Sequence, residues 1–181
     1  MKISIIGTAG KNARSHERAM LDKNLFIKMA QAALDIFPKD NHLLVSSGTA
    51  YAEHIAIWLF LNGPNLKMQN TLHIHLPSLF DLEQKRFYGN TDADVANLYH
   101  RYFTWRTGIN SLGEIAQALQ MESCTHTISN GFKEWNLLVG NTDLLIAFTF
   151  GADGMPDTHG TRHTWMHSTA QQKIHIPIQS L

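Results

Sequence analysis

Apolar, strand-like segments that end in turns of small residues alternate along this chain with segments of helical spacing, and this alternation constrains the fold most strongly. Strands are expected at 2–6, 42–47, 71–76, 143–150 and 172–178. Helices are expected at 20–37, 50–61, 92–105, 111–121, 132–140 and 160–170. Such alternation builds a parallel sheet with helices on both faces. The chain is therefore predicted to be an α/β protein, a three-layer α/β/α sandwich with a mostly parallel sheet in the order 3-2-1-4-5.

The length of 181 residues fits one domain with enough chain to bury a core, and no linker or repeat divides it. We therefore expect a single domain over 1–181. Residues 78–110 are its least regular part and are rich in aromatic and charged side chains. This insert is interpreted as a lid or an oligomer contact, so a homo-oligomer, a dimer or a higher assembly, is expected.

Composition argues against several functional classes. The 15 basic residues are balanced by 15 acidic ones and are scattered, which argues against a nucleic-acid partner. No apolar stretch approaches the length of a membrane span, and residues 1–7 lack the pattern of a secretory signal, so no membrane partner is expected. Cys124 is the only cysteine, which excludes internal disulfides and a thiolate zinc site. A cytoplasmic location is expected.

Four turns of small residues point to one binding site. Three of them follow predicted strands and one opens a predicted helix: Gly7-Thr8-Ala9-Gly10, Ser46-Ser47-Gly48-Thr49-Ala50, Leu76-Pro77 and Gly160-Thr161-Arg162. In an open parallel sheet, the loops that leave the carboxyl ends of the strands meet where ligands bind. Small residues let backbone amides approach a phosphate, and a helix N-terminus adds a favourable dipole. The pattern predicts a phosphate-bearing small molecule as ligand and no bound cofactor.

Two of these turns are candidate phosphate sites. The amides of Gly7, Thr8, Ala9 and Gly10 could donate to phosphate, with the charge of Lys11 beside them. The alternative is a plain strand-to-helix turn. Gly160, Thr161 and Arg162 at the start of a helix form the second candidate, and a simple N-cap is its alternative.

Glu53 is the candidate for recognition of a sugar. It follows Ser47, Gly48 and Thr49 by about one helical turn, and its carboxylate could accept ribose hydroxyls or act as nucleophile or base at an anomeric carbon. A solvated glutamate near a helix N-terminus is the alternative. If the protein is an enzyme, Glu53 is the residue to which catalysis is assigned.

Further side chains are predicted to complete the ligand site. Pro77 and Phe80 follow the third strand, where Phe80 could stack on a base or pack in a loop. Asn136 and His159 are the remaining candidate ligand contacts. The chain has eleven histidines, some at the spacing of metal ligands, but no carboxylate completes a recognisable set. No metal site is predicted.

In sequence order, these motifs resemble the Rossmann-like SLOG superfamily, which contains the DNA-processing A proteins and the Lonely-guy nucleotide hydrolases. The resemblance is carried by the following segments over nearly the whole chain: Ile6-Gly7-Thr8-Ala9-Gly10, Ser47-Gly48-Thr49-Ala50-Tyr51-Ala52-Glu53, Trp135-Asn136, Asp143-Leu144-Leu145-Ile146-Ala147-Phe148 and His159-Gly160-Thr161. It implies a nucleotide or nucleotide-derived ligand, including ADP-ribose-type signals in some branches.

Two positions depart from this family pattern. Thr164 stands where the Lonely-guy hydrolases carry the glutamate of glycosidic cleavage, and Trp135 stands where an arginine usually precedes the asparagine. We therefore expect a protein that senses or sequesters a nucleoside phosphate or an ADP-ribose-like molecule. The alternative is an N-glycosidase or phosphoribohydrolase that cleaves the base–ribose bond of a nucleoside monophosphate or an NAD-like substrate.

Overall fold

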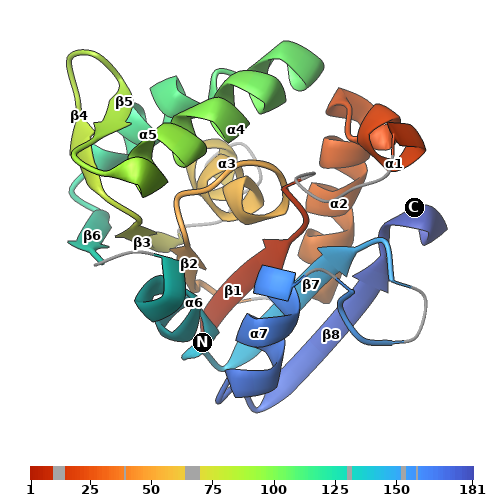
Figure 1. Ribbon diagram of the computed structural model, residues 1–181. Helices are drawn as coiled ribbons and strands as arrows, with labels where there is room; N and C mark the ends of the chain where they lie inside the picture. The colour runs from red at the N-terminus through yellow and green to blue at the C-terminus, as the bar shows by residue number, and fades with distance from the viewer. Residues whose placement is uncertain (10–14, 39, 64–69, 130–131, 152–153, 158) are drawn as a thin grey trace.

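A computed structural model describes residues 1–9, 15–38, 40–63, 70–129, 132–151, 154–157 and 159–181 (Figure 1). Its centre is a six-stranded sheet in the order β6-β3-β2-β1-β7-β8, in which every described strand pair is parallel. The strands are β1 (Lys2–Gly7), β2 (Leu43–Ser46), β3 (Thr71–Leu76), β6 (Cys124–Ile128), β7 (Leu144–Thr149) and β8 (Gln172–Pro177). The predicted α/β class and the relative order of the five predicted strands are confirmed, and β6 is an additional strand that extends that order.

The sixth strand was missed because its sequence carries almost no apolar signal. β6 reads Cys-Thr-His-Thr-Ile and is mostly exposed. It lies at the edge of the sheet, where it pairs with β3 in the register His73 with Thr125 and His75 with Thr127. An edge strand is stabilised by hydrogen bonds to one neighbour and does not need the continuous apolar run of a central parallel strand.

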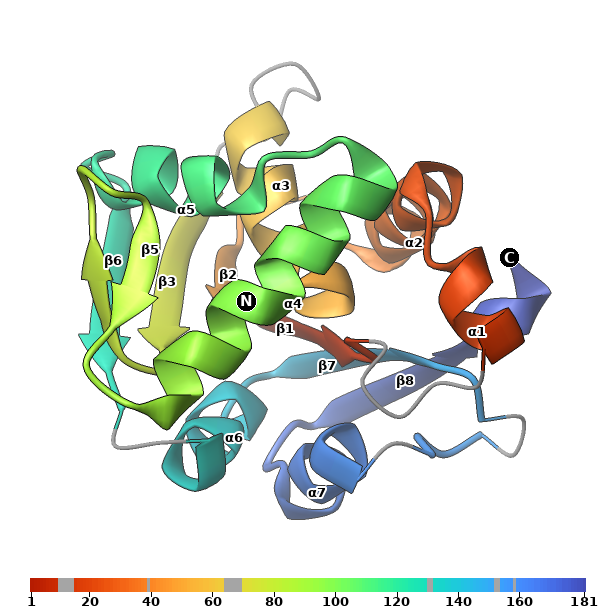
Figure 2. The same ribbon diagram turned by 45° about the horizontal axis from the view of Figure 1, so that its top comes forward.

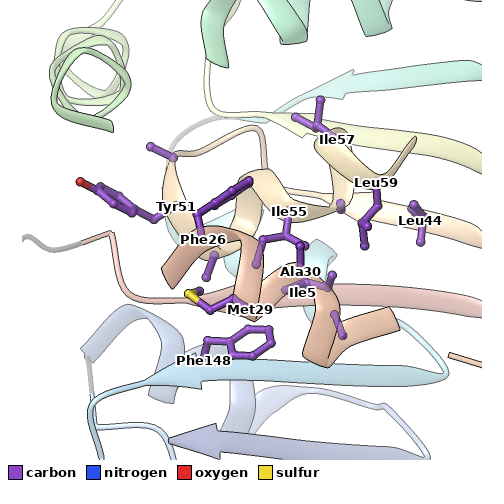
Figure 3. Close-up of a cluster of buried hydrophobic side chains, with 14 of the residues drawn as sticks. Ile5, Phe26, Met29, Ala30, Leu44, Tyr51, Ile55, Ile57, Leu59 and Phe148 are labelled. Atoms are coloured by element: carbon purple, nitrogen blue, oxygen red, sulfur yellow. The ribbon is translucent and has the colours of Figure 1, made fainter. Parts of the chain in front are cut away.

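Helices cover both faces of the sheet and produce two cores (Figures 1 and 2). The larger core lies under α2, α3, α4 and α5, and the labelled residues of Figure 3 belong to it. The smaller core lies on the opposite face, under α6 and α7. Alternation along β1 explains the division, since Ile3 and Ile5 enter the larger core and Ile6 enters the smaller one. The helices are α1 (Ser15–Met20), α2 (Lys23–Ile36), α3 (Ile55–Asn62), α4 (Thr91–Thr107), α5 (Ser111–Leu119), α6 (Phe132–Gly140) and α7 (His159–His167).

The insert at 78–110 is more regular than the sequence predicts. It consists of a hairpin, β4 (Leu79–Asp81) and β5 (Arg86–Tyr88), followed by the 17-residue helix α4. The hairpin is fixed to α4 by Asn97, whose side chain bonds both the N–H and the C=O of Phe87. The expected helix near 92–105 is confirmed, whereas the irregular conformation expected before it is wrong.

The helix expected at 50–61 begins differently from an ordinary α-helix. Its first turn is a 3-10 helix, η1 (Tyr51–His54), and α3 continues from Ile55. A second short 3-10 turn, η3 (Ile178–Ser180), follows β8. Among the helices described, none combines the length and the apolar character needed to cross a bilayer.

Candidate functional site

The turn after β1 is built by close packing. A Cβ atom at Gly7 would lie 2.2 Å from the Phe148 carbonyl oxygen of β7 and 2.5 Å from Ala52 Cβ of η1. The Thr8 amide donates to the same Phe148 carbonyl at 3.0 Å, so this amide serves the sheet and is not offered to a phosphate. Ala9 is half-buried, and Gly10 and Lys11 lie outside the described residues. Glycine at position 7 is therefore required for packing.

The carboxyl group of Glu53 lies where the turns after β1 and β2 meet. The hydroxyls of Ser47 and Thr49 both donate to Glu53 Oε2, and the Gly7 amide donates to the same carboxyl group. Burial raises the pKa of Glu53 to about 6, and these three donors oppose that rise. The structure thus brings together four residues that the sequence predicts for the site, Gly7, Ser47, Thr49 and Glu53.

The backbone between Ser47 and Glu53 passes twice through the left-handed region. Gly48 has φ +68°, which glycine adopts freely. Tyr51 has φ 60°, a conformation that costs a non-glycine residue about 1–2 kcal/mol. The buried Tyr51 ring packs edge-on against Phe103, with centroids 5.0 Å apart, and its hydroxyl points away from the core cluster in Figure 3. Strain of this kind is common where a fold holds functional groups in place.

A buried histidine from the insert holds this loop from behind. His100 of α4 has Nε2 3.0 Å from the Gly48 carbonyl and Nδ1 2.8 Å from the Ser111 hydroxyl. Because a carbonyl only accepts, Nε2 carries the proton and Nδ1 accepts from Ser111. Burial, together with the neighbouring His54, lowers the pKa of His100 to about 3, and the bond to the Gly48 carbonyl opposes this shift. His100 is therefore neutral at physiological pH and acts as a fixed donor to the loop.

Behind His100, a second buried histidine joins the same polar cluster. His54 Nε2 lies 2.6 Å from Glu114 Oε2, and the rings of His54 and His100 are 6.1 Å apart. No motif in the sequence marks His54, His100 or Glu114 as a site residue. Nothing local to either histidine indicates its partner, because Glu114 is 60 residues from His54 and Gly48 is 52 residues from His100.

Trp135 connects the ends of two strands. Its indole N–H lies 2.8 Å from the Ser47 carbonyl and 2.7 Å from the His75 carbonyl. It thereby fixes the backbone after β2 relative to the end of β3, at the position where the resemblance expects an arginine. Trp135 therefore supports the site. The difference from the arginine of the SLOG pattern did not by itself indicate this role.

The first turn of α7 is attached to the turn after β1. The hydroxyl of the buried Thr161 donates to the Gly7 carbonyl at 3.0 Å, so this hydroxyl orients the helix. Thr164 donates to Asn136 Oδ1 at 3.1 Å, which gives Asn136 a structural partner. Gly160 and Arg162 are exposed, and a Cβ at Gly160 would meet open space. His159 begins α7, and its side chain lies outside the described part of the structure.

The predicted base-contacting residues lie in the segment that leaves β3. Pro77 is buried directly after the strand. Phe80 of β4 packs edge-on against Phe87 of β5, with ring centroids 5.0 Å apart. Its ring also joins the larger core, so the contacts that the structure gives to Phe80 are those of hairpin packing.

Comparison with known proteins identifies a viral relative. The chain is 30% identical to "Uncharacterized protein R261" of Acanthamoeba polyphaga mimivirus, over 98% of this chain and 96% of the viral protein. The chain belongs to the R261 family. No family model matches it, and no solved structure matches it.

Several histidines of the R261-family chain serve the sheet. His73 and His75 lie on one face of β3, and their Nδ1 atoms lie 2.7 Å from the hydroxyls of Thr125 and Thr127 on β6. Burial lowers the pKa of His75 to about 4, which keeps its ring neutral. Within the described residues, no three His, Cys, Asp or Glu side chains are placed to hold a metal ion.

We expect Trp135→Phe to lower the free energy of unfolding by about 1.5 kcal/mol, because two buried carbonyls lose a donor while most of the apolar ring is kept. Urea denaturation followed by circular dichroism measures the loss. Trp165→Phe on α7 is the matched control, since its indole N–H has no partner among the described residues. Equal losses in the two variants would show that the bonds to Ser47 and His75 contribute nothing.

Proposed function

We propose that this protein binds a nucleotide-derived small molecule, a nucleoside phosphate or an ADP-ribose-like ligand, and senses or sequesters it. The observation that carries the proposal is the Glu53 carboxyl group, held by Ser47, Thr49 and Gly7 at the carboxyl edge of a parallel sheet. This edge is where open α/β sheets bind their ligands. A buried carboxyl group with a raised pKa at such an edge is a candidate functional group.

The contacts described for Glu53 leave one acceptor position of its carboxylate for a ligand hydroxyl. An ionised carboxylate has about four acceptor positions. Two are used by the hydroxyls that meet at Oε2 and a third by the Gly7 amide. A ribose hydroxyl that donates to the remaining position fits this acceptor, which supports a sugar-bearing ligand. Since a carboxylate accepts better than a carboxylic acid, affinity should increase as the pH rises through about 6.

The N-terminal turn of α7 supports the assignment of a phosphate. Thr161 attaches this turn to the carbonyl of Gly7, whose amide bonds Glu53. The exposed Gly160 leaves the backbone of the turn open to approach, and the amides and dipole of a helix N-terminus favour an anion. A sugar at Glu53 and a phosphate at α7 would therefore belong to one ligand.

The test is equilibrium binding of AMP, ADP-ribose, cyclic ADP-ribose and NAD by calorimetry. Wild-type protein should bind at least one of them. Gly160→Asp should weaken that binding at least tenfold, because it sets a carboxylate against the phosphate in a place with no steric conflict. The matched control is Gln171→Asp. It makes the same charge change at the exposed residue before β8, where the amino ends of the strands lie. Equal affinities in both variants would overturn the phosphate site.

The raised pKa of Glu53 also supports a second candidate, an N-glycosidase or phosphoribohydrolase. A carboxyl group whose pKa is about 6 can exchange a proton near neutral pH, as a general base at an anomeric carbon must. In that reaction a water oxygen bonds to the anomeric carbon as the bond to the base breaks, and Glu53 takes the proton of the water. Chromatography of the same mixtures over time separates the candidates. Base release that stops in Glu53→Gln supports the enzyme, and recovery of intact bound nucleotide supports the binder.

Three further proposals concern the family, the location and the assembly of the protein. On the motifs shared with it, we propose membership of the SLOG superfamily. We propose a cytoplasmic location, because a single cysteine, Cys124, gives no disulfide framework. We also propose a homo-oligomer, since the insert presents exposed aromatic side chains.

A further inference from the structure

Two histidines of α7 lie against each other. His163 and His167 are about one helical turn apart, and their ring centroids are separated by 4.4 Å with the ring planes tilted by 44°. Neither imidazole forms a hydrogen bond or an ion pair with another residue that the structure describes. The ring nitrogens of this pair are therefore not used to hold the described part of the fold together.

Most other histidines with described side chains already have a partner. A ring nitrogen contacts a protein group in each of His42, His54, His73, His75, His100 and His175. The rings of His73 and His75 also lie close together, with centroids 4.5 Å apart. Their Nδ1 atoms are occupied by threonine hydroxyls, however, and His75 Nε2 is enclosed. The α7 pair differs because its two imidazoles meet with their nitrogens unused.

The α7 pair is accessible to an ion from solvent. His167 is exposed and His163 is half-buried, on a helix that lies beside α6 on the outside of the sheet (Figure 1). Nδ1 of His163 is enclosed, so Nε2 is the nitrogen of this ring that a metal would bind. The helix ends at His167, and the carbonyls of a last turn favour a cation. Lys173 Nζ already bonds one of these carbonyls, that of Trp165, at 2.8 Å.

We propose that His163 and His167 bind a divalent transition metal ion of the class that prefers imidazole, Zn²⁺, Ni²⁺ or Cu²⁺. Histidines four residues apart on one helix face chelate a metal ion, because the spacing brings both imidazoles to one point. Cu²⁺ should bind most tightly of the three. Within the described residues, no group of three His, Cys, Asp or Glu side chains surrounds a metal position, so water or an external ligand fills the remaining coordination positions. This site is separate from Glu53 and does not depend on the proposed nucleotide.

Titration of the full chain with Cu²⁺ alone tests this site, with electron paramagnetic resonance reporting the nitrogens bound to the ion. The tightest-bound Cu²⁺ of the wild-type protein should be held one to one and show coupling to two imidazole nitrogens. His163→Ala and His167→Ala should each weaken this binding at least tenfold, because a chelate becomes a single ligand. Alanine favours the helix, so the circular dichroism of both variants should match the wild type. His126→Ala, at an exposed position of β6, and His73→Ala, from the other close pair, are the controls and should bind as the wild type does.

Three results would overturn the proposal. The first is a wild-type protein without one-to-one Cu²⁺ binding, or with fewer than two nitrogens on the ion. The second is wild-type affinity in both His163→Ala and His167→Ala. The third is a loss of binding in His73→Ala with none in the α7 variants, which would place the metal on β3. Because the probe is the metal alone, none of these results bears on the nucleotide proposal.

Discussion

Gly7→Ala is expected to destabilise the fold by more than about 3 kcal/mol, a large part of the roughly 5–15 kcal/mol that stabilises a domain. The added Cβ would lie 2.2 Å from the Phe148 carbonyl oxygen and 2.5 Å from Ala52 Cβ, both far inside contact distance. Neither neighbour is the flexible end of a side chain. One is the backbone of a central strand and the other begins the turn that carries Glu53. Relief of the clash must therefore separate β1 from β7 or displace η1.

Urea denaturation measures this effect, with circular dichroism reporting the remaining helix and strand. Gly160→Ala is the matched control, because the same methyl group meets open space there and lies in a helix, where alanine is favoured over glycine. The control should match or slightly exceed the stability of the wild type. A loss below about 1 kcal/mol in Gly7→Ala would show that β1 and η1 have room to separate without breaking the core.

Apolar periodicity was sufficient to predict the central part of this fold. The buried strands β1, β2, β3 and β7 read as apolar runs between turns, and the order chosen for them, among the few topologies that the crossover rule leaves, agrees with the sheet. Apolar periodicity did not predict the strands that are stabilised by contacts other than apolar burial. The strand β6 is held by hydrogen bonds to β3, and its exposed Thr and His residues resemble a loop. The β4–β5 hairpin has only three residues per strand, too few for a period to be recognised.

The candidate site also contains residues that the sequence predicts and residues that it does not. Ser47, Thr49 and Glu53 lie within seven residues, so their proximity could be predicted from local sequence alone. His100 meets Gly48 across 52 residues, and Trp135 meets Ser47 across 88. No spacing rule connects residues so far apart, because only the tertiary fold brings them together. Gly7 shows a subtler failure, since glycine suits both phosphate approach and close strand packing, and the sequence cannot separate these two reasons.

The Glu53 carboxyl group should make stability depend on pH in a direction opposite to that of a salt-bridged carboxylate. Burial raises the pKa of Glu53 from 4.5 to about 6, so the folded protein holds this proton more tightly than the unfolded chain. The resulting stabilisation is complete below pH 4.5 and is lost as pH rises through about 6. It corresponds to about 2 kcal/mol, and Glu53→Gln removes it because an amide does not titrate. The free energy of unfolding of the wild type, minus that of the variant, should therefore fall by about 2 kcal/mol between pH 4 and pH 7.5.

Ser47→Ala provides the internal check on this prediction. The Ser47 hydroxyl donates to Glu53 Oε2 and opposes the rise in pKa, so its removal should raise the pKa of Glu53 further. The midpoint of the stability change should then move to higher pH, while Glu53→Gln shows no such change. A wild-type difference that is flat from pH 4 to 7.5 would mean that Glu53 is solvated. A buried carboxylate that lowers stability at neutral pH is hard to explain by folding alone, because glutamine would fit the same space without this cost. Its presence is explained if the ionised group is needed to accept a ligand.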